Sequence, residues 1–583
     1  MAQAGAGVLA ELVGASSVCG DLIALAVVPR VGLGMAVCAR DVSVSVAVEE
    51  PSETVALVEE ALQPRWVLWS NDTAALLASS GVRIAKCWDI AAVHRLLFGG
   101  WRADPGRVWA CVHGLALATI PTTAPADLFG DVEDGAGDPE DPVRPDGHLR
   151  AEWTAGAWRA SPDRMKRWAE LAASTAALQQ ARLKEPSIPS RAASTVRSES
   201  AAELLCAEMS SDGLPMRRPD AEEIIAGFIG PRPRNEAEAA EHRARRDAEV
   251  LRHGPSGLQV DLRSPGQVKS LLRLVGVELP DTRAWRLRAV RDAHPLIDPL
   301  LAWRKAERVA TTYGYAWLDA HLGADDRLRG AWTGSDGAAG RMTASSGLHN
   351  MPTEMRGAVV ADAGRIFVRA DLGQIEPRVL AAVSGDVELA RATWEDDMYA
   401  PVAAELGVDR ATAKVAMLGA MYGQTTGRGL QALRRLEAAF PAAMNYLEEA
   451  ARSGHAGRDL RTYGGRLVLM GPPSAKQLDE NQERKQAAAR GRYGRNALVQ
   501  GAAAELFKAW AATVRARGAP LEARIVLCLH DELLVHAPIE HGEEVVQLVD
   551  ECLQEAAYRW APDRTVRFVA DVQVVERWSE AKS

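Results

Sequence analysis

Residues 365–378 read RIFVRADLGQIEPR, and the change of pattern within them predicts a strand followed by a helix. The apolar residues 366–368 predict a β-strand that ends at Asp371. Proline is accepted in the first turn of a helix but not further in, so Pro377 predicts a helix that begins near Ile375. An aspartate at the end of a strand can hold a hard cation through oxygen. The alternative is a turn aspartate that caps the helix, and this segment alone favours that alternative.

Residues 409–423 read DRATAKVAMLGAMYG and predict an amphipathic helix capped by Asp409. One face of this helix carries residues that recur every four positions: Arg410, Lys414, Leu418 and Tyr422. Two cations, an apolar group and an aromatic ring, in that order, suit a ligand with a polyphosphate at one end and a flat base at the other. The spacing alone does not distinguish this from a helix that only packs against a core.

Residues 524–537 read RIVLCLHDELLVHA and place His530, Asp531 and Glu532 between two apolar β-type runs. This pattern predicts a hairpin with acids at its tip. Aspartate is common in turns, so a structural turn is the alternative. Adjacent acids repel each other unless a positive charge lies between them, and a bound metal would supply that charge.

The N-terminal part of the chain, up to about residue 120, predicts an α/β domain because β-type and helical runs alternate. The β-type runs are Leu22–Val28 and Arg65–Trp69, and the helical runs are Thr54–Leu62 and Ala74–Ser79. Further on, we expect an exposed acidic loop at 129–147, a helix at 162–183 and a Pro/Ser-rich joint at 184–200. Residues 201 to about 322 are mainly helical in pattern, and after residue 365 the pattern changes to strand, helices and strands again.

The three motifs together resemble those of family A DNA polymerases, the family of bacterial DNA polymerase I. The first is similar to DYSQIELR, the second to the fingers helix RxxxKxxxFxxxYG, and the third to the HDE turn of the palm. Their order and separation agree as well. The resemblance is firm from about residue 335 to the end and weaker from 200 to 335.

Shorter segments strengthen the resemblance. Residues 340–343 are similar to GRLS, residues 349–352 to QNIP, residues 492–501 to RxxxNxxxQG, and residues 575–578 to the closing NW segment. The resemblance implies DNA-binding roles for Arg341, Asn350, Arg492, Asn496, Gln500 and His530. It implies nucleotide-binding roles for Arg356, Gln374, Glu376, Tyr399, Arg410, Lys414, Leu418 and Tyr422.

The implied chemistry is two-metal nucleotidyl transfer from dNTPs to the 3′ end of a primer paired with template DNA. Asp371 and Asp531 would hold two Mg²⁺ ions, for which Mn²⁺ could substitute. One ion would activate the primer 3′-hydroxyl and the other would support the triphosphate and the leaving pyrophosphate. Glu376 would be the steric gate that excludes a ribose 2′-hydroxyl. The implied catalytic residues are Asp371, Asp531, Glu532 and Lys414.

The implied fold is α+β and multidomain: a right-hand polymerase with an antiparallel palm sheet and helical fingers and thumb, preceded by an α/β RNase H-like exonuclease-type domain. We expect an exonuclease-like domain at 1–185, a linker at 186–200 and a thumb-like region at 201–335. The palm is expected at 336–395 and 496–583, with the fingers at 396–495. We also expect that no 5′-nuclease domain precedes the chain.

Three departures from the family pattern concern the nucleotide pocket. Leu418 replaces the usual Phe or Tyr, Tyr399 stands where many members have a histidine, and Leu372-Gly373 replaces Tyr-Ser. The acids expected to bind metal are intact, so these departures affect the expected nucleotide affinity.

The N-terminal domain is expected to be an inactive 3′–5′ exonuclease. Residues 69–93 resemble the second exonuclease segment of the family, with Asp72 at a metal-binding position. The first motif is DxE on an early strand, but the matching residues 7–19 contain only Glu11, with Asp21 as a displaced candidate. The third motif pairs a tyrosine with an aspartate, where this chain has Trp168 and Ala172. One aspartate cannot balance the charge of two Mg²⁺ ions.

Composition is that of a globular protein, with 47% hydrophobic and 25% charged residues, and it lacks a membrane-spanning run or a secretory signal. Seven scattered cysteines without a CxxC pair indicate reduced thiols. We therefore expect a cytoplasmic, nucleoid-associated monomer without membrane contact. The net charge of −9 argues against a nucleic-acid partner, but residues 484–495 contain five cations opposed only by Glu483 and predict a local basic patch.

Three alternatives stand beside the main hypothesis. A single-subunit RNA polymerase shares the palm aspartates and the fingers lysine, but Glu376 and the HDE turn argue against it. A non-catalytic DNA-binding relative would be favoured by loss of a metal aspartate, and both are present. A bifunctional 3′–5′ exonuclease and DNA polymerase depends on the N-terminal domain.

Overall fold

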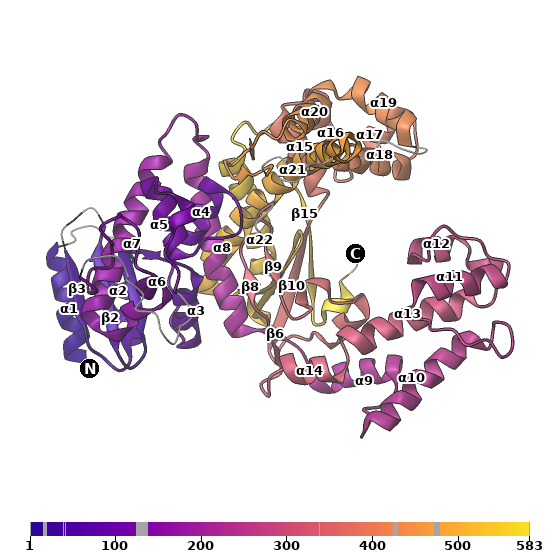
Figure 1. The fold of residues 1–583 in the computed structure, drawn as a ribbon, viewed down its shortest axis with the longest axis horizontal. Coiled ribbons are helices and arrows are strands. Elements are labelled where there is room, and N and C mark those ends of the chain that lie inside the picture. Colours follow the sequence, from indigo (N-terminus) through magenta and orange to yellow (C-terminus); the bar gives the residue numbers. More distant parts are fainter. Residues whose placement is uncertain are drawn as a thin grey trace. The chain divides into compact units, whose positions relative to one another are not determined.

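The computed structural model describes residues 2–15, 20–38, 40, 42–123, 138–336, 339–423, 429–471 and 479–581. The chain forms two compact units, coloured by sequence in Figure 1. The first unit contains Met1–Asp212, Ala331–Thr343 and Gly364–Val574. The second contains Gly213–Gly330, Ala344–Ala363 and Val575–Ser583.

The N-terminal part of the first unit is built on a mixed five-stranded sheet with the order β3-β2-β1-β4-β5. The central strand β1 (Leu22–Val28) pairs antiparallel with β2 (Gly32–Val37) and parallel with β4 (Arg65–Leu68). The edge strands are β3 (Ser43–Val46) and β5 (Lys86–Asp89). The α/β domain predicted from the alternating pattern is confirmed.

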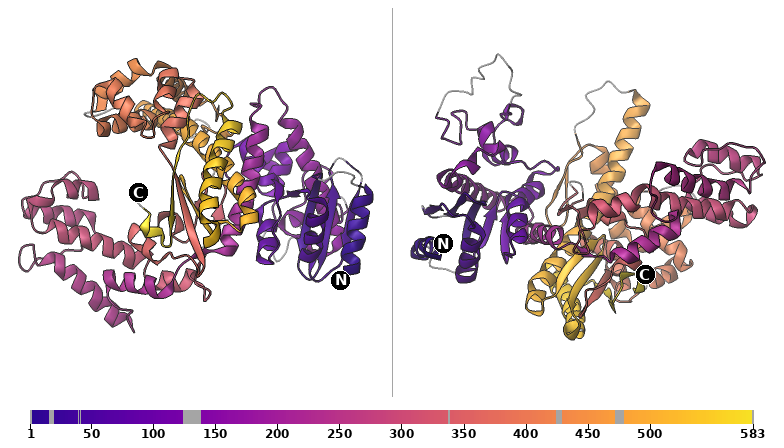
Figure 2. Two further views of the ribbon diagram at one scale, coloured as in Figure 1. Left: turned by 180° about the vertical axis from the view of Figure 1, so that it is seen from behind. Right: turned by 90° about the horizontal axis from the view of Figure 1, so that it is seen from below.

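Helices cover both faces of this sheet (Figure 2). Alternate residues of a strand point to opposite faces. Accordingly, Ile23 and Leu25 pack in a core with α1 (Ala2–Ala15), α2 (Pro51–Leu62) and α3 (Asn71–Ser79). Ala24 and Ala26 pack in a second core with helices that include α4 (Ile90–Phe98), α5 (Pro105–His113) and α7 (Pro162–Arg182). The helix expected at 162–183 is therefore confirmed.

Two expectations for this region are corrected. The match of residues 7–19 to the DxE motif, which lies on a strand in the family, does not agree with the structure, because residues 2–15 form helix α1 and residues 16–19 lie outside the described residues. The linker expected at 186–200 ends early, because α8 (Ala192–Asp212) begins inside it. Helix α8 forms there because small apolar residues such as Ala192 and Val196 pack into the core of the N-terminal domain.

Buried ion pairs hold α8 against the long helix α21 (Glu480–Gly518). Glu199 Oε2 accepts hydrogen bonds from Lys508 Nζ at 2.7 Å and from Arg466 Nη2 at 2.5 Å. All three side chains are at most 2% exposed. Removing one partner of a buried charge pair leaves the other unpaired at high cost, so this contact fixes α8 to α21.

The second sheet of the first unit has the order β13-β14-β10-β15. Strand β14 (Glu532–Pro538) pairs antiparallel with both β10 (Arg365–Leu372) and β13 (Arg524–Leu529). The fourth strand is β15 (Ala570–Val575), which follows α22 (Gly542–Trp560). The hairpin predicted from residues 524–537 is confirmed, and β10 runs one residue past its predicted end at Asp371.

Helices α15 to α20 lie in sequence between β10 and α21. They are α15 (Ile375–Ser384), α16 (Val387–Ala392), α17 (Tyr399–Leu406), α18 (Arg410–Tyr422), α19 (Gly429–Ala439) and α20 (Pro441–His455). The helix start predicted near Ile375 and the cap predicted at Asp409 are both confirmed. Helix α20 packs closely on α21 at Gly454, where an added Cβ would lie 2.6 Å from the Arg490 carbonyl oxygen.

The second unit is mainly helical, as predicted from residues 201–322. Its helices are α9 (Arg218–Ile229), α10 (Glu236–Leu251), α11 (Pro265–Leu274), α12 (Ala284–Ala289), α13 (Ile297–Thr312) and α14 (Tyr315–His321). Leu271, Leu300 and Trp303 belong to its core. Residues 344–363 and 575–583, which were expected in the palm, lie in this unit, and residues 201–212 of the expected thumb lie in the first unit. The division into palm, fingers and thumb stays a prediction.

Some expectations concern residues that the structure describes only in part. Residues 129–137 of the predicted acidic loop and Cys19 lie outside the described residues. The other six cysteines are free thiols. Among the described residues, no helix is both long and apolar enough to span a membrane.

Candidate active site

The register of β10 and β14 brings the predicted acids of two motifs together. Asp371 lies opposite Glu532, and the backbone N–H of Leu372 donates to the Asp531 carbonyl oxygen at 3.0 Å. His530 and Asp531 alone separate β13 from β14, and His530 adopts the left-handed conformation with φ 57°. This tight turn holds Asp531 beside the end of β10.

The carboxylates at this strand end carry more negative charge than the surrounding protein balances. Burial, followed by the nearby Asp531, raises the pKa of Asp371 to about 6. Burial also raises the pKa of Asp531, and Glu376 and Glu532 add to this rise. Two such oxygen donors fit a hard divalent cation, which would offset their repulsion. Among the described residues, no group of three or more His, Cys, Asp or Glu side chains is placed to hold a metal.

A positive charge already lies beside these acids, and sequence analysis missed it. Arg369 Nη2 donates to Asp371 Oδ2 at 2.5 Å and to Glu532 Oε2 at 3.0 Å. Its Nη1 donates to Asp571 Oδ2, on β15, at 3.2 Å. Thus the charge between the acids, which we expected a metal to supply, comes in part from the protein. The period-two alternation of a strand could have placed Arg369 on the face of Asp371, but not beside Asp571.

A second arginine, Arg378, fixes the loop that follows Asp371. Its side chain on α15 is fully buried and donates to the backbone oxygens of Gly373 at 2.9 Å and Arg567 at 2.7 Å. Further bonds reach the carbonyl oxygens of residues 393, 395 and 396. A single guanidinium therefore ties the turn after β10 to the loop before α17 and to the segment before β15.

Gln374 continues this anchoring with its side chain. It adopts the left-handed conformation at φ 54°, and its Nε2 donates to Asp397 Oδ1 at 3.0 Å. Its Oε1 accepts from the backbone N–H of Met398 at 2.9 Å. Asp397 also pairs with Arg410. Gln374 thus positions the acid that holds the first cation of α18.

The predicted face of α18 is present as a row of side chains. Asp409 Oδ1 accepts the Thr412 N–H at 2.9 Å and caps the helix. Arg410 and Lys414 are exposed, and their cationic ends lie 5.8 and 5.9 Å from the ring centroid of Tyr399. Tyr399 is only 3% exposed, and burial raises the pKa of its hydroxyl to about 12. The buried Tyr399 ring therefore packs beneath the two exposed cations, Arg410 and Lys414.

Glu376 accepts hydrogen bonds from two side chains that lie far from it in the sequence. The Tyr422 hydroxyl donates to its Oε2 at 2.8 Å, and Arg341 Nη2 donates to its Oε1 at 2.7 Å. A cavity of about 300 Å³ lies here. Helices α15, α17, α18 and α21, the turn after β10 and the tip of the β13–β14 hairpin contribute to its lining, together with Arg341. The lining residues include Gln374, Glu376, Tyr399, Leu418, Tyr422, His530 and Asp531. The structure thus brings three sequence motifs to one cavity.

Two predicted site residues, Asn350 and Arg356, belong to the second unit. The Arg356 guanidinium lies 4.2 Å from the ring centroid of Trp578. The backbone oxygen of Asn350 accepts from the Tyr313 hydroxyl at 2.6 Å and from Arg308 at 2.7 Å.

Three predicted DNA-binding residues lie on α21. Arg492 is exposed, whereas Asn496 and Gln500 are half-buried, and the four-residue spacing places them on one side of the helix. The basic patch at 484–495 is more neutralised than expected. Arg484 pairs with Glu480, and Arg495 Nη2 lies 2.6 Å from Glu448. The second pair joins residues 47 positions apart, which the sequence pattern could not reveal.

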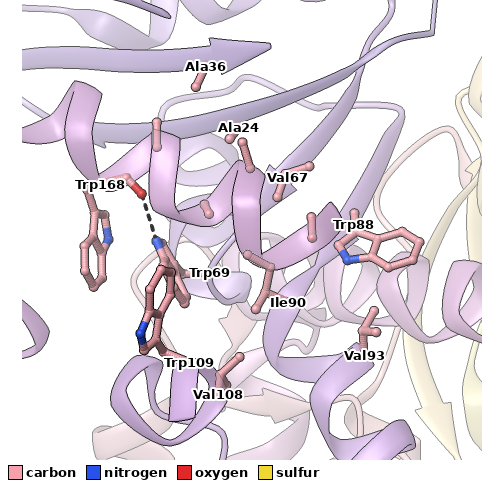
Figure 3. Close-up of a cluster of buried hydrophobic side chains, with 14 of the residues drawn as sticks. Ala24, Ala36, Val67, Trp69, Trp88, Ile90, Val93, Val108, Trp109 and Trp168 are labelled. Carbon is pink, nitrogen blue, oxygen red and sulfur yellow. Dashed lines mark hydrogen bonds between the residues drawn. The ribbon is translucent and has the colours of Figure 1, made fainter. Parts of the chain in front are cut away.

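The N-terminal domain holds aromatic rings and small apolar residues where the exonuclease motifs were aligned (Figure 3). Trp69 stacks on Trp168 with ring centroids 4.7 Å apart, and its Nε1 donates to the Trp168 carbonyl oxygen at 3.2 Å. Trp168 and Ala172 are both buried in the core of this domain. Strand β1 has no acidic residue. Asp72 is exposed in the first turn of α3, where Ser70 donates to it at 2.8 Å.

The remaining candidate acids of this domain are also accounted for. Glu11 lies exposed on α1, and Asp21 pairs with Arg40 at 3.7 Å. Neither belongs to a described cluster of metal-ligating side chains.

Comparisons with known proteins agree with this arrangement. A model described as DNA polymerase family A matches residues 234–580. The thermostable DNA polymerase I of Thermus aquaticus is 30% identical over 384 residues, which cover 59% of this chain and 44% of that protein. The DNA polymerase I of Chloroflexus aurantiacus is 30% identical over 324 residues, which cover 50% of this chain and 33% of that protein. The chain thus spans less than half of the length of these relatives.

A solved structure is similar over nearly the whole fold. It is the POL domain of Pol1 from M. smegmatis in complex with DNA primer-template and dNTP, with a TM-score of 0.67 and 20% sequence identity. The match covers 98% of each chain. The α+β multidomain fold predicted from the sequence is therefore confirmed.

The raised pKa of Asp371 predicts how the metal-free protein responds to pH. A carboxyl with a higher pKa when folded than when unfolded costs stability as pH rises, and the full cost is present above pH 6. Asp371→Asn removes this cost. Because the side chain is a third exposed, we expect a gain of only about 1–2 kcal/mol at pH 7.5 in EDTA, which disappears near pH 4. Thermal unfolding at both pH values measures it.

Asp397→Asn is the matched control for this prediction. The hydrogen bond from Arg410 lowers the pKa of Asp397, so this variant should lose stability at pH 7.5. An Asp371→Asn protein that is no more stable than the wild type at pH 7.5 would contradict the account of the site's charge.

Proposed function

Because the chain belongs to DNA polymerase family A, we propose that it is a template-directed DNA polymerase that extends a primer 3′ end with dNTPs. The observation that carries this proposal is the cavity where Asp531, Glu376 and the face of α18 meet. Its lining includes two acids, Asp531 and Glu376, and the apolar side chain and the ring at the end of the α18 row, Leu418 and Tyr422. The two cations of that row, Arg410 and Lys414, precede them on the same helix face. This order fits a nucleoside triphosphate presented to a metal-dependent site.

Asp371 and Asp531 would hold the divalent ions, Mg²⁺ or Mn²⁺, in a two-metal site. When bound, such ions supply electrostatic stabilisation of the reacting oxygens and of the pyrophosphate. Their raised pKa values support this role, since a bound cation would relieve the repulsion between these carboxylates. Neither aspartate then needs to act as a base. Glu532 would orient the metal site or the primer end.

The cations of α18 would bind the triphosphate. Arg410 and Lys414 are exposed above the Tyr399 ring, and Lys414 would stabilise the charge that develops during transfer. Leu418 and Tyr422 would pack against the sugar and base. Gln374 would help to position Arg410 through its hydrogen bond to Asp397. Arg356 is proposed as a further triphosphate contact.

Primer-template DNA would lie across several elements. We assign its binding to Arg341, Asn350, Arg492, Asn496, Gln500 and His530. Contacts with phosphate and sugar supply most of the affinity for a duplex, so these residues are expected to share the binding free energy. The monomeric state and the cytoplasmic, nucleoid-associated location stay predictions.

The N-terminal domain is proposed to have lost 3′–5′ exonuclease activity. The support is the replacement of expected acids by the buried Trp168 and Ala172, together with a β1 strand that carries no acid. One exposed Asp72 cannot replace the several carboxylates that two Mg²⁺ ions require. A bifunctional exonuclease and polymerase is the second candidate function.

Asp371→Asn and Asp531→Asn should each nearly abolish primer extension while leaving primer-template binding largely intact. Each carboxylate would act mainly in the transition state, whereas duplex affinity comes from many phosphate contacts. Single-turnover extension and a gel shift measure the two effects. A rate within about tenfold of wild type, a loss of ~1.4 kcal/mol, would refute the metal assignment. Normal DNA binding by a wild type without extension would favour a non-catalytic relative.

Glu376→Ala should admit ribonucleotides. Glu376 is held by Tyr422 and Arg341, which supports the proposal that its side chain would fill the space of a 2′-hydroxyl. Competing incorporation of dNTPs and rNTPs measures the ratio. Glu388→Ala, at an exposed glutamate of α16 paired with Arg391, is the matched control and should change nothing. An unchanged ratio in Glu376→Ala would reject the gate and reopen the RNA polymerase hypothesis.

Incubation with Mg²⁺ and a 3′-mismatched primer, without dNTPs, should leave the primer at full length. The reason is the missing acids of the N-terminal domain. Asp72→Ala and Asp371→Asn show whether any shortening comes from the N-terminal domain or from the candidate active site. Primer shortening that is lost in Asp72→Ala but kept in Asp371→Asn would establish the bifunctional alternative.

A further inference from the structure

Arg369 occupies an unusual place for a cation, two residues before a proposed metal ligand on the same face of β10. Its side chain is 5% exposed, and β10 lies between β14 and β15 in the sheet. Both neighbouring strands supply an acid to it, Glu532 at 3.0 Å and Asp571 at 3.2 Å. Together with Asp371 at 2.5 Å, one guanidinium links carboxylates from three strands.

We propose that Arg369 is a positioning residue that competes with divalent cations for Asp371. The inference rests on the proposed function, in which Asp371 and Asp531 hold the ions. Arg369 donates to Oδ2 of Asp371, which leaves Oδ1 for a metal. Divalent ions held by Asp371 and Asp531 would draw on the whole Asp371 carboxylate, including the Oδ2 that accepts from Arg369. Full occupancy would therefore require Asp371 to leave Arg369.

The positive charge of Arg369 also opposes the binding of a divalent cation at Asp371. The guanidinium of an arginine carries a positive charge and only hydrogen-bond donors. It preforms the acid cluster without metal, because it offsets part of the repulsion among the carboxylates. The same charge repels an incoming cation. The acids nevertheless outnumber it, because Asp371, Glu532 and Asp571 all contact this one guanidinium, so a cation can still bind.

The contacts of Arg369 also permit the exchange. Nη1 donates to Asp571 and Nη2 to Glu532 as well as to Asp371. The guanidinium can release Asp371 and keep two ionic partners, which avoids the large cost of an unpaired buried charge. Asp371 is therefore the partner that Arg369 can give up, and the metal-free and metal-bound sites differ by this one contact.

Binding of Mn²⁺ to the full-length, metal-stripped protein tests the proposal without relying on activity. Electron paramagnetic resonance measures free Mn²⁺ during a titration. We expect Arg369→Gln to bind Mn²⁺ about fivefold or more tightly than the wild type, since a nearby positive charge and a competing donor are removed. The rise in thermal midpoint on adding Mn²⁺ should also be larger in this variant.

Arg365→Gln is the matched control, because Arg365 lies at the other end of β10 and pairs with Glu522 at 2.8 Å. It should bind Mn²⁺ like the wild type. Asp531→Asn should weaken binding and so identifies the site being titrated. Arg369→Lys is a second variant in case Arg369→Gln does not fold: it keeps the charge, but one ammonium cannot span three carboxylates, so its affinity should exceed that of the wild type.

Affinity no higher than wild type in the folded Arg369 variants would overturn the competition. Absence of any Mn²⁺ binding that depends on Asp531 would overturn the metal site of the proposed function itself. The two failures are therefore distinguishable in one titration series.

Discussion

The antiparallel pairing of β10 with β14 sets Asp371 opposite Glu532, and the backbone bond from Leu372 to Asp531 locks the hairpin tip beside them. A slip of one residue would turn Asp371 to the other face of the sheet. Buried apolar residues on both strands, such as Phe367 and Leu534, oppose such a slip. The positions of Asp371, Asp531 and Glu532 thus depend on a register that the hydrophobic core of the sheet enforces.

Two buried arginines stabilise this arrangement in different ways. Arg369 binds side-chain carboxylates, so its influence is on the charge of the site. Arg378 binds backbone carbonyl oxygens from three segments, so its influence is on the path of the chain after β10. The planar fork of donors on a guanidinium suits both tasks, which a lysine ammonium could not perform with the same geometry. The proposed catalytic acids are positioned by groups that do not themselves contact a substrate.

Local features were predicted well from the sequence because each is encoded by neighbouring residues. Pro377 predicted the start of α15, and Asp409 predicted the start of α18. The apolar runs on either side of 530–532 predicted the hairpin. The contacts of Arg369 with Asp571 and of Lys508 with Glu199 were missed, since they join residues 202 and 309 positions apart. The start of α8 at Ala192 was also missed, because tertiary packing overrides the local pattern of a Pro/Ser-rich joint. The match of residues 7–19 to a strand-borne exonuclease motif failed, because residues 7–15 belong to helix α1.

The claim that this site copies DNA is tested most directly by extension of one labelled primer on four templates that differ only in the first unpaired base. The chain would be given Mg²⁺ and a single dNTP in each reaction. We expect the primer to grow by one nucleotide only where the dNTP complements the template base, and a 3′-dideoxy primer not to grow. Extension that ignores the template base, or no extension on any template by a folded protein that binds the duplex, would contradict it.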